Sequence, residues 1–284
     1  MKLTANNKTL DLSTPKIMGI LNFTPDSFSD SGKFFQLDKA LFQVERMLNQ
    51  GASIIDIGGE STRPMAEEVT LEEELERVVP LVEAVRKRFD CWISVDSSKA
   101  QVMQEAAKVG MDLINDIRAL QEPDALQTAA RLALPVCIMH MQGQPRTMQL
   151  NPHYDDVVAD VLKFMQQRTE QCLASGIKKE NLIWDPGFGF GKSVQHNYCL
   201  LQQFSVFCEQ GYPVLAGISR KSMIGAVLDK PVEQRTVGSV AAVLIAAMKG
   251  ASILRVHDVG ETADALKIWL ATQNAKIRSC AVGR

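Results

Sequence analysis

The sequence predicts a (β/α)8 barrel, and three observations carry this prediction. Short apolar runs alternate with helical stretches along almost the whole chain, which is typical of βα units around a parallel sheet. There are eight such runs, and they read as continuously apolar, as strands buried on both faces do. No linker, short-period repeat or low-complexity segment divides the 284 residues. A single domain over residues 1–284, closed as a TIM barrel, is therefore favoured over an open doubly wound sheet.

The elements can be placed along the chain. The predicted strands are residues 17–21, 53–57, 92–95, 113–114, 136–139, 182–184, 214–217 and 253–256. The predicted helices are residues 37–49, 71–89, 100–109, 125–132, 155–174, 196–210, 237–248 and 262–273. The first fifteen residues precede the first strand, and we expect them to form a short hairpin or cover over the bottom of the barrel.

Two helices have features of their own. The second begins at a capping box made by Thr70 and Glu73 and contains Pro80, which predicts a kink. Residues 237–248 are apolar nearly all round, and we expect this helix to be well buried.

Composition excludes several classes of protein. A net charge of -2 gives no electrostatic footprint for nucleic acid. No apolar run approaches the roughly 20 residues of a membrane-spanning helix, and the start of the sequence lacks the apolar core of a signal peptide. Six widely separated cysteines indicate neither a zinc cage nor a disulfide framework. These features predict a cytoplasmic protein that binds neither nucleic acid nor membrane.

Polar side chains end nearly every predicted strand, where a barrel of this class assembles its active site. Taken singly, each has a structural explanation such as a helix cap, a turn or a satisfied histidine. As a set they cannot all be buried unless they pair or meet a ligand rich in donors and acceptors. In chain order the set includes Asn22, Arg63, Asp96, Asn115, Asp116, His140, Asp185, Lys221, Arg255 and His257.

The set divides into two chemistries. Asp96, Asn115 and Asp185 offer acceptors and one amide, which suits a heterocycle with ring N–H and exocyclic amino groups. Arg63, Arg255 and His257 suit a phosphate or diphosphate, because guanidinium groups make paired charge-assisted bonds to its oxygens. On the neighbouring first strand, Asn22 could supply one oxygen ligand to Mg²⁺, which is commonly coordinated by substrate phosphates and water as well.

Residues 181–192 contain a short apolar run that delivers Asp185, and a glycine-rich turn begins directly afterwards at Pro186. The turn matches neither a Walker loop nor a dinucleotide-binding fingerprint, because the required glycines are absent from their places. It exposes backbone where a planar or anionic ligand can approach closely.

Two loops at the predicted mouth, residues 23–36 and 58–69, are unusually long. Both are rich in turn-forming residues, and the first carries an aromatic residue, Phe28. Because they adjoin the anion half of the mouth, we interpret them as lids.

The strand-end motifs together resemble the dihydropteroate synthase family of the folate pathway. The resemblance covers essentially the whole chain, and its specificity lies in the combination of motifs. These are residues 18–30 (MGILNFTPDSFSD), 56–64 (DIGGESTRP), 94–99 (SVDSSK), 114–117 (INDI), 185–192 (DPGFGFGK), 219–222 (SRKS) and 255–258 (RVHD).

The resemblance implies condensation of 4-aminobenzoate with (7,8-dihydropterin-6-yl)methyl diphosphate, releasing diphosphate and forming 7,8-dihydropteroate. It implies that the pterin is held by Asp96, Asn115, Asp185 and Lys221. The diphosphate would be held by Asn22 with magnesium, Thr62, Arg63, Arg255 and His257. The 4-aminobenzoate site, where sulfonamides compete, would be lined by Phe28, Thr62, Pro64, Phe190, Lys221 and Ser222. Such enzymes are usually homodimers.

A dissociative, SN1-like mechanism is compatible with these residues. An aryl amine is already nucleophilic, so the chief requirement is departure of diphosphate from the pterin methylene. Arg63, Asp185, Lys221, Arg255 and His257 are the predicted catalytic residues, acting on the charges that develop in that step.

Other interpretations remain open at this point. A methyltransferase that passes a folate methyl group to a corrinoid would keep the ring-binding set but has no use for the Arg255 and His257 pair. An aldolase that forms a Schiff base on Lys221 would want an adjacent proton-shuttling residue, which is missing. A barrel that binds pterin without turnover would need none of Asn22, Arg63 and His257.

Overall fold

Eight parallel strands form one sheet in the order β8-β7-β6-β5-β4-β3-β10-β9. The computed structural model describes residues 1–23, 33–60, 69–143, 148 and 151–275. Each strand lies at a predicted position, and the ends differ by two residues at most. The bounds are β3 Lys16–Asn22, β4 Ile54–Gly58, β5 Trp92–Asp96, β6 Leu113–Asp116, β7 Val136–Met139, β8 Leu182–Asp185, β9 Leu215–Ala216 and β10 Ile253–Val256.

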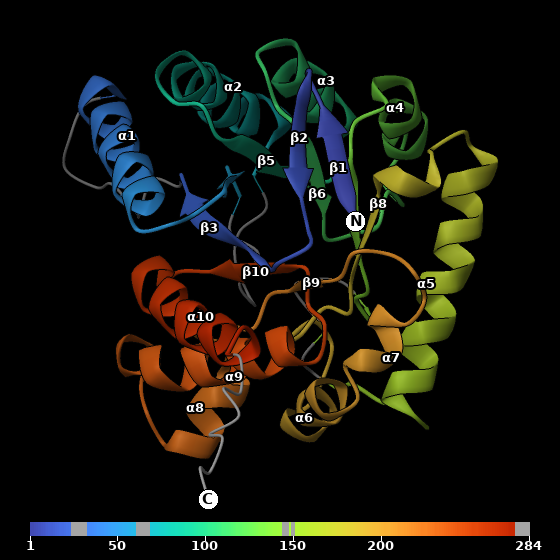
Figure 1. Cartoon of the computed structure of the whole chain (residues 1–284). Helices are drawn as coiled ribbons and strands as arrows, with labels where there is room; N and C mark the ends of the chain where they lie inside the picture. Colours follow the sequence, from blue (N-terminus) through green and yellow to red (C-terminus); the bar gives the residue numbers. More distant parts are fainter. Residues whose placement is uncertain (24–32, 61–68, 144–147, 149–150, 276–284) are drawn as a thin grey trace, which may run out of the picture.

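The two ends of this sheet meet and close a barrel. An isolated parallel bridge joins Trp184 of β8 to Val214, the residue before β9. The amide of Trp184 also donates to the carbonyl of Pro213 at 2.9 Å. The predicted (β/α)8 fold is therefore confirmed, with the helices arranged around the strands (Figure 1).

One helix or a pair of helices follows each barrel strand. Two short 3₁₀ helices, η2 Lys179–Asn181 and η3 Val232–Gln234, lie in the connections. The helices are α1 Lys33–Asn49, α2 Leu71–Arg88, α3 Ala100–Lys108, α4 Ala125–Leu132, α5 Val157–Ala174, α6 Val194–Gln202, α7 Ser205–Cys208, α8 Ser222–Leu228, α9 Thr236–Met248 and α10 Val259–Gln273.

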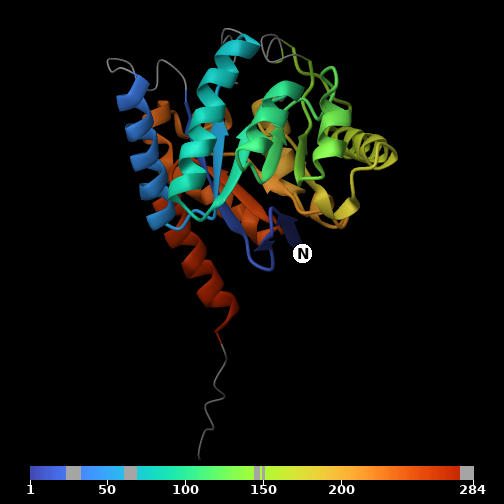
Figure 2. The same cartoon turned by 90° about the horizontal axis from the view of Figure 1, so that it is seen from above.

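The N-terminal segment is the hairpin expected from its sequence. Strands β1 Lys2–Ala5 and β2 Lys8–Asp11 pair antiparallel. At the turn between them, the side-chain Nδ2 of Asn6 donates to the carbonyl of Met111 and to a carboxylate oxygen of Asp112, both at 2.9 Å. These two residues directly precede β6, so the hairpin covers the amino ends of the strands, which Figure 2 shows as the lower end of the barrel.

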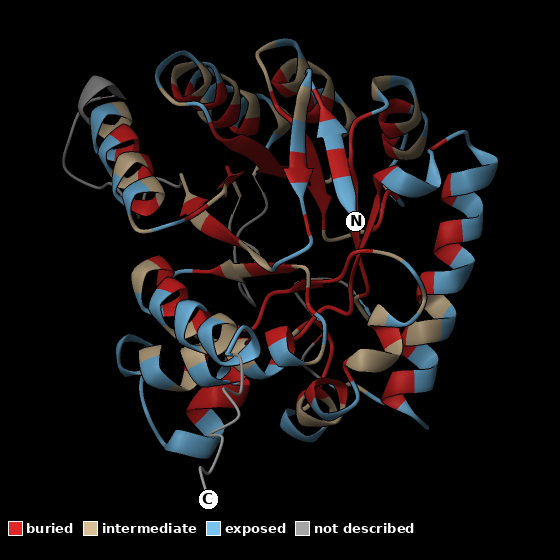
Figure 3. Ribbon diagram, in the orientation of Figure 1, coloured by how far each residue is buried: buried red, intermediate tan, exposed pale blue. Residues whose placement is uncertain are grey.

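The core lies in and around the barrel wall. Every residue of β4 to β8 is buried, and the helices turn their buried faces toward these strands (Figure 3). Burial on both faces explains why the strands read as unbroken apolar runs. Asp56 is an exception within β4, being a carboxylate with no exposed surface.

Helix α2 begins as its sequence predicts. The Glu73 amide donates to the Thr70 hydroxyl at 3.3 Å, and the Thr70 amide donates to the Glu73 carboxylate at 3.0 Å. The helix contains Pro80 and is not interrupted there.

The prediction of one helix over residues 196–210 is wrong, because α6 and α7 are separate. The break was not visible in the apolar spacing, since Leu200 and Leu201 before it and Phe204 and Phe207 after it all remain buried. Helix α8, which begins directly after Lys221, was also missed. Helix α1 begins at Lys33, so the last four residues of the first predicted loop are helical. Residues 24–32 and 61–68 of the two predicted loops lie outside the described residues.

The expectation that residues 237–248 are buried all round is wrong. Helix α9 buries Ser239, Ala242, Val243, Ala246 and Ala247 on one side, where it packs against α6, α8 and α10. On its other side, Val237 is 80% exposed, Met248 60% and Ile245 43%. The apolar composition therefore reflects a second surface of this helix rather than complete burial.

Within the described residues, no helix combines the length and apolar character needed to cross a membrane.

Candidate active site

The side chains at the carboxyl ends of β3 to β10 surround one mouth of the barrel. At its centre lies Arg255 of β10, whose Nε donates to Asp56 Oδ2 and whose Nη2 donates to Asp96 Oδ2, both at 2.7 Å. Asn115 of β6 donates through Nδ2 to Asp56 Oδ2 at 3.2 Å. One guanidinium thus links carboxylates from β4 and β5 and holds the wall opposite β10 in a fixed arrangement.

Burial changes the proton affinity of this cluster. Burial raises the pKa of Asp96 to about 7, and the positive charge of Arg255 only partly offsets it. The negative charge of Asp56 adds to the rise. For Arg255, burial alone would lower the pKa of the guanidinium, but Asp56 and Asp96 outweigh burial and hold that pKa above its usual range. Arg255 is therefore a permanent cation beside a carboxyl that can exchange a proton near neutral pH.

Asp185 and Lys221 form the other wall. A β-carbon on Gly217 would lie 3.8 Å from Asp185 Oδ2 and 3.9 Å from Lys221 Nζ. Gly217 therefore lies between an acceptor and a donor, and a side chain at this position would contact both. The Gly187 amide donates to Asp185 Oδ1 at 2.7 Å and fixes the carboxylate, while burial raises its pKa.

Lys221 stands at the edge of the glycine-rich turn. Its Nζ donates to the carbonyl of Phe188 and lies 4.6 Å from the centre of the Phe190 ring. Burial lowers the pKa of its amine to about 8, although the charge of Asp185 opposes this. The backbone reaches Lys221 through Arg220, which has a left-handed φ of 58°. Arg220 adopts this conformation while its guanidinium pairs with Asp258.

An apolar surface continues this wall. Phe190 packs with Met139 and Met148, and Ile117 and Met141 lie against the same cluster. A flat ring placed between Asp96 and Lys221 would find hydrogen-bonding groups at its edge and apolar side chains at its side.

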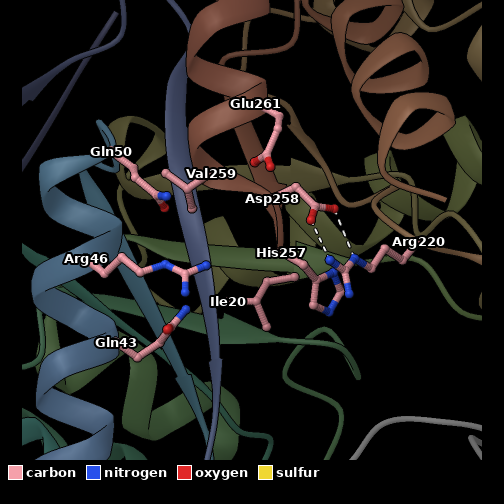
Figure 4. A pocket seen from close by; sticks show the side chains of 9 residues that line it. All are labelled: Ile20, Gln43, Arg46, Gln50, Arg220, His257, Asp258, Val259 and Glu261. Carbon is pink, nitrogen blue, oxygen red and sulfur yellow. Dashed lines mark hydrogen bonds and ion pairs between the residues drawn. The ribbon is translucent and has the colours of Figure 1, made fainter. Parts of the chain in front are cut away.

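His257 directly follows β10, beside the loop after β9 that carries Lys221. Its amide donates to the Ser219 hydroxyl at 3.2 Å, and its ring Nδ1 lies 3.2 Å from the same oxygen. Beside it is a cavity of about 260 Å³. Figure 4 shows the Arg220–Asp258 pair on one side of this cavity and Arg46 of α1 on the other.

Asn22 ends β3 next to the start of the second predicted loop, with Gly58 as its partner in the sheet. A β-carbon on Gly58 would lie 3.6 Å from the Asn22 amide oxygen. No group of three or more metal-ligating His, Cys, Asp or Glu side chains occurs among the described residues. A single amide oxygen fits Mg²⁺ that is held mainly by phosphate and water, not a cage built from protein.

The structure brings six of the predicted site residues to one mouth: Asn22, Asp96, Asn115, Asp185, Lys221 and Arg255, with Phe190 and His257 at its edges. Ser222 begins α8 and is exposed. Phe28, Thr62, Arg63 and Pro64 lie outside the described residues. Asp116, also a strand-end residue, turns away from this cluster and accepts bonds from Ser98, Arg118 and Leu120.

Sequence reasoning missed three members of the site. Asp56 lies one residue before the end of its predicted strand and was noted only as the first residue of a motif. A charged residue within a buried strand was the signal that could have found it. Ser219 and Lys192 were noted only as parts of motifs; their roles depend on contacts with His257 and His140 that no spacing reveals.

The arrangement can bind two kinds of group side by side. The buried acceptors and the lysine suit a planar heterocycle, and Arg255 and His257 suit the anionic substituent of that heterocycle.

Comparisons with known proteins agree with this chemistry. The profile of the family described as "Pterin binding enzyme" matches residues 18–257. The dihydropteroate synthase of Haemophilus influenzae is 78% identical over 275 residues, which cover 97% of this chain and all of that protein.

Solved structures give the same result. The Yersinia pestis dihydropteroate synthase with a sulfonamide drug superposes with a TM-score of 0.92 at 58% identity, covering 97% of this chain and 100% of that one. The Xanthomonas albilineans dihydropteroate synthase in complex with 7,8-dihydropteroate has a TM-score of 0.89 at 44% identity, with coverage of 97% and 100%. The chain therefore belongs to the pterin-binding enzymes and, within them, to the dihydropteroate synthase family.

Proposed function

We propose that this protein condenses 4-aminobenzoate with (7,8-dihydropterin-6-yl)methyl diphosphate to give 7,8-dihydropteroate and diphosphate. The observation that carries the proposal is the polar mouth, on which Asp96, Asn115, Asp185 and Lys221 converge around Arg255. Relatives that share this chain over nearly its full length bear the name dihydropteroate synthase.

In this proposal the pterin lies between the two walls. The carboxylates of Asp96 and Asp185 accept from ring N–H and amino groups, and the Asn115 amide completes the polar edge. Lys221 donates to a ring acceptor. Gly217 leaves the space that the ring fills, since any larger residue would project between Asp185 and Lys221.

The diphosphate lies toward β3 and β10 in this account. Arg255 and His257, together with Thr62 and Arg63 from the loop after β4, bind its oxygens through charge-assisted bonds. Asn22 would hold Mg²⁺, which supplies further neutralisation of the phosphate charge. The two predicted loops close over the substrates as lids and exclude water from the reacting carbon.

The reaction follows from this placement. The bond between the pterin methylene carbon and the diphosphate oxygen breaks first, and its electron pair leaves with the diphosphate. Asp185 stabilises the resulting cationic pterin, and the amine nitrogen of 4-aminobenzoate then forms the new bond to carbon and loses a proton. The departing diphosphate carries negative charge away. Removal of one cationic side chain that contacts it is therefore expected to raise the activation free energy by about 3 kcal/mol, which lowers the rate roughly a hundredfold.

The second substrate occupies the outer part of the mouth. Its ring lies against Phe190 and the methylene stem of Lys221, with Ser222 at the N-terminus of α8 and Phe28, Thr62 and Pro64 from the two loops. A sulfonamide, which carries a similar aryl amine, would compete for the same place.

We further propose that residues 1–284 act as one domain in a cytoplasmic homodimer. Support for the dimer comes from apolar side chains exposed on three adjoining elements of the surface. Helices α8 and α10 both pack against α9, and exposed apolar residues occur on all three and on η3. They are Val227, Leu228, Val232, Val237, Ile245, Met248 and Ile268. A patch of this kind is typical of a surface that is buried between subunits.

The test is diphosphate release by the purified protein with dihydropterin diphosphate and magnesium, measured with and without 4-aminobenzoate. Release that requires the amine supports the proposal. Binding of the pterin without release would identify a binding protein, and methyl transfer from a methylfolate would identify a corrinoid-dependent methyltransferase.

A further inference from the structure

Lys192 is a buried lysine that the proposed mechanism does not use. It is 2% exposed, at the end of the glycine-rich turn after β8. Its Nζ donates to the carbonyls of Gly187 at 2.8 Å, Phe190 at 3.0 Å and His140 at 3.3 Å, and lies 2.9 Å from His140 Nδ1. All of its hydrogen-bonding capacity is therefore spent inside the protein.

The acceptors belong to two segments that touch through their backbones. His140 follows β7, and Gly187 and Phe190 lie in the turn after β8. A β-carbon on Gly187 would lie 1.9 Å from the His140 carbonyl oxygen, and one on Gly191 would lie 2.4 Å from the Gln142 carbonyl oxygen. Carbonyl groups from both segments point into the same space, and Lys192 supplies the donors that hold them together.

The imidazole of His140 is suited to accept from this lysine. Burial, reinforced by the positive charge of Lys192, lowers the pKa of His140 to about 2, so the ring is neutral. Burial also lowers the pKa of the Lys192 amine, and the charge of Asp185 opposes this. The three carbonyl dipoles around the amine offset part of the cost of burying its charge.

The stretch between the two anchored carbonyls carries the groups that meet Lys221. Phe188 offers the carbonyl to which Lys221 donates, and Phe190 offers the ring below its Nζ. A β-carbon on Gly189 would lie 3.0 Å from Lys221 Cδ. Lys192 thus fixes residues 187 and 190, and the three residues 188–190 form the surface on which the Lys221 side chain lies.

We propose that Lys192 is a positioning residue of the active site, whose buried amine fixes the glycine-rich turn and through it places Lys221 and Phe190 against the substrates. This inference rests on the proposed function, since it assigns Lys221 to the pterin. Lys192 touches neither substrate in this account and acts only through the turn.

The experiment is a double-mutant cycle between Lys192→Met and Lys221→Met. Methionine keeps the unbranched stem of lysine and removes its donors. Affinity for 6-hydroxymethyl-7,8-dihydropterin is measured by calorimetry, kcat and KM by diphosphate release, and folding by thermal unfolding. Lys178→Met is the matched control, because Lys178 is an exposed lysine in the connection between α5 and β8.

We expect Lys192→Met to weaken pterin binding at least tenfold and to lower kcat/KM by roughly ten- to a hundredfold, while the control stays within twofold of the parent. In the Lys221→Met background the same substitution should have little further effect on pterin binding, because the group through which it acts is gone. Lys192→Gln, which retains an N–H donor, should recover part of the loss.

Two results would overturn the inference. The first is a pterin affinity that is unchanged in folded Lys192→Met. The second is a double variant whose loss of pterin affinity equals the product of the losses in the two single variants, as expected of a residue that acts on stability alone. If Lys192→Met does not fold, the same cycle with Lys192→Gln decides by the same criteria. A parent protein that shows no amine-dependent release would instead contradict the proposed function, whatever the variants do.

Discussion

At the scale of single residues, burial makes the mouth reactive. Asp96 and Asp185 are buried and Lys221 is partly buried, and removal from water shifts the pKa of each group in the direction that favours its neutral form. Arg255 remains charged because two carboxylates face it. Shifted pKa values among side chains that converge at strand ends are typical of sites that bind and stabilise a changing charge.

The first prediction concerns pH. Ionised Asp96 is the better acceptor for ring N–H groups, and its pKa lies near 7, so pterin binding should weaken as pH falls through 7. Protonated Lys221 is the donor, and its pKa lies near 8, so binding should weaken as pH rises through 8. Calorimetry with a diphosphate-free dihydropterin should give tightest binding between these values, without interference from phosphate titration. Affinity that does not vary between pH 6 and 9 would contradict the assignment of these two residues.

The second prediction concerns Asp56. Asp56→Asn keeps the shape but removes the charge that pairs with Arg255 and raises the pKa of Asp96. We expect kcat/KM to fall roughly tenfold or more, as for loss of one partner of a buried charge pair, and the acidic limb of the pH profile to move to lower pH. The control is Asp264→Asn on the exposed side of α10. A profile that keeps its acidic limb near 7 would show that Asp56 does not act on Asp96.

At this scale the sequence predicted residues that end strands and missed those whose role is tertiary. Asp96, Asn115 and Asp185 directly follow predicted strands, and Arg255 lies one residue before the end of the last one, so a barrel alone brings them together. Asp56 and Lys192 could not be assigned in this way. One lies within a strand, and the other depends on a turn meeting the end of a different strand.

At the scale of elements, the turn after β8 shows how closely backbone must approach backbone. Gly187 has a φ of 72°, and its missing side chain is the space occupied by the His140 carbonyl. No substitution can relieve that contact without moving the turn, because the obstacle is backbone and not a flexible side chain.

The third prediction therefore compares two glycines with left-handed φ. Gly187→Ala should destabilise the protein by more than about 3 kcal/mol, since strain and a severe clash add. Gly176→Ala, at a φ of 93° with nothing within 4 Å of the new carbon, should cost only about 1–2 kcal/mol from backbone strain. Urea denaturation measures both values. Equal losses in the free energy of unfolding would mean that the His140 carbonyl does not restrict the side chain at position 187.

Element boundaries were less predictable than element types. The break between α6 and α7 leaves apolar side chains buried on both sides, so the helical spacing continues across it. The sequence of helix α9 suggests complete burial because apolar residues occupy two different sides of the helix. One packs against the neighbouring helices, and the other is exposed in the single chain.

At the scale of the whole molecule, closure of the barrel brings β10 beside β3 and so places Arg255 and His257 near Asn22. This closure was predictable, because eight buried strands alternating with helices have few other arrangements. The proposed surface between subunits was not predictable from the strands, since it depends on which helix faces remain uncovered.

The fourth prediction tests that surface. Ile245→Glu or Met248→Glu places a charge on the exposed apolar face of α9 and should convert a dimer to monomers in analytical ultracentrifugation. Phe42→Glu is the control, because Phe42 is also a large exposed apolar residue but lies on α1. A parent protein that sediments as a monomer, or a dimer unaffected by either α9 substitution, would contradict the proposed interface.

The most direct test of the account is mass-spectrometric detection of 7,8-dihydropteroate formed by the parent protein and by Asp185→Ala under identical conditions. The account predicts product in equal amount to released diphosphate for the parent, and at least roughly a hundredfold less for a folded Asp185→Ala protein. Diphosphate released without dihydropteroate, or equal product from both proteins, would show that this mouth of the barrel does not carry out the reaction.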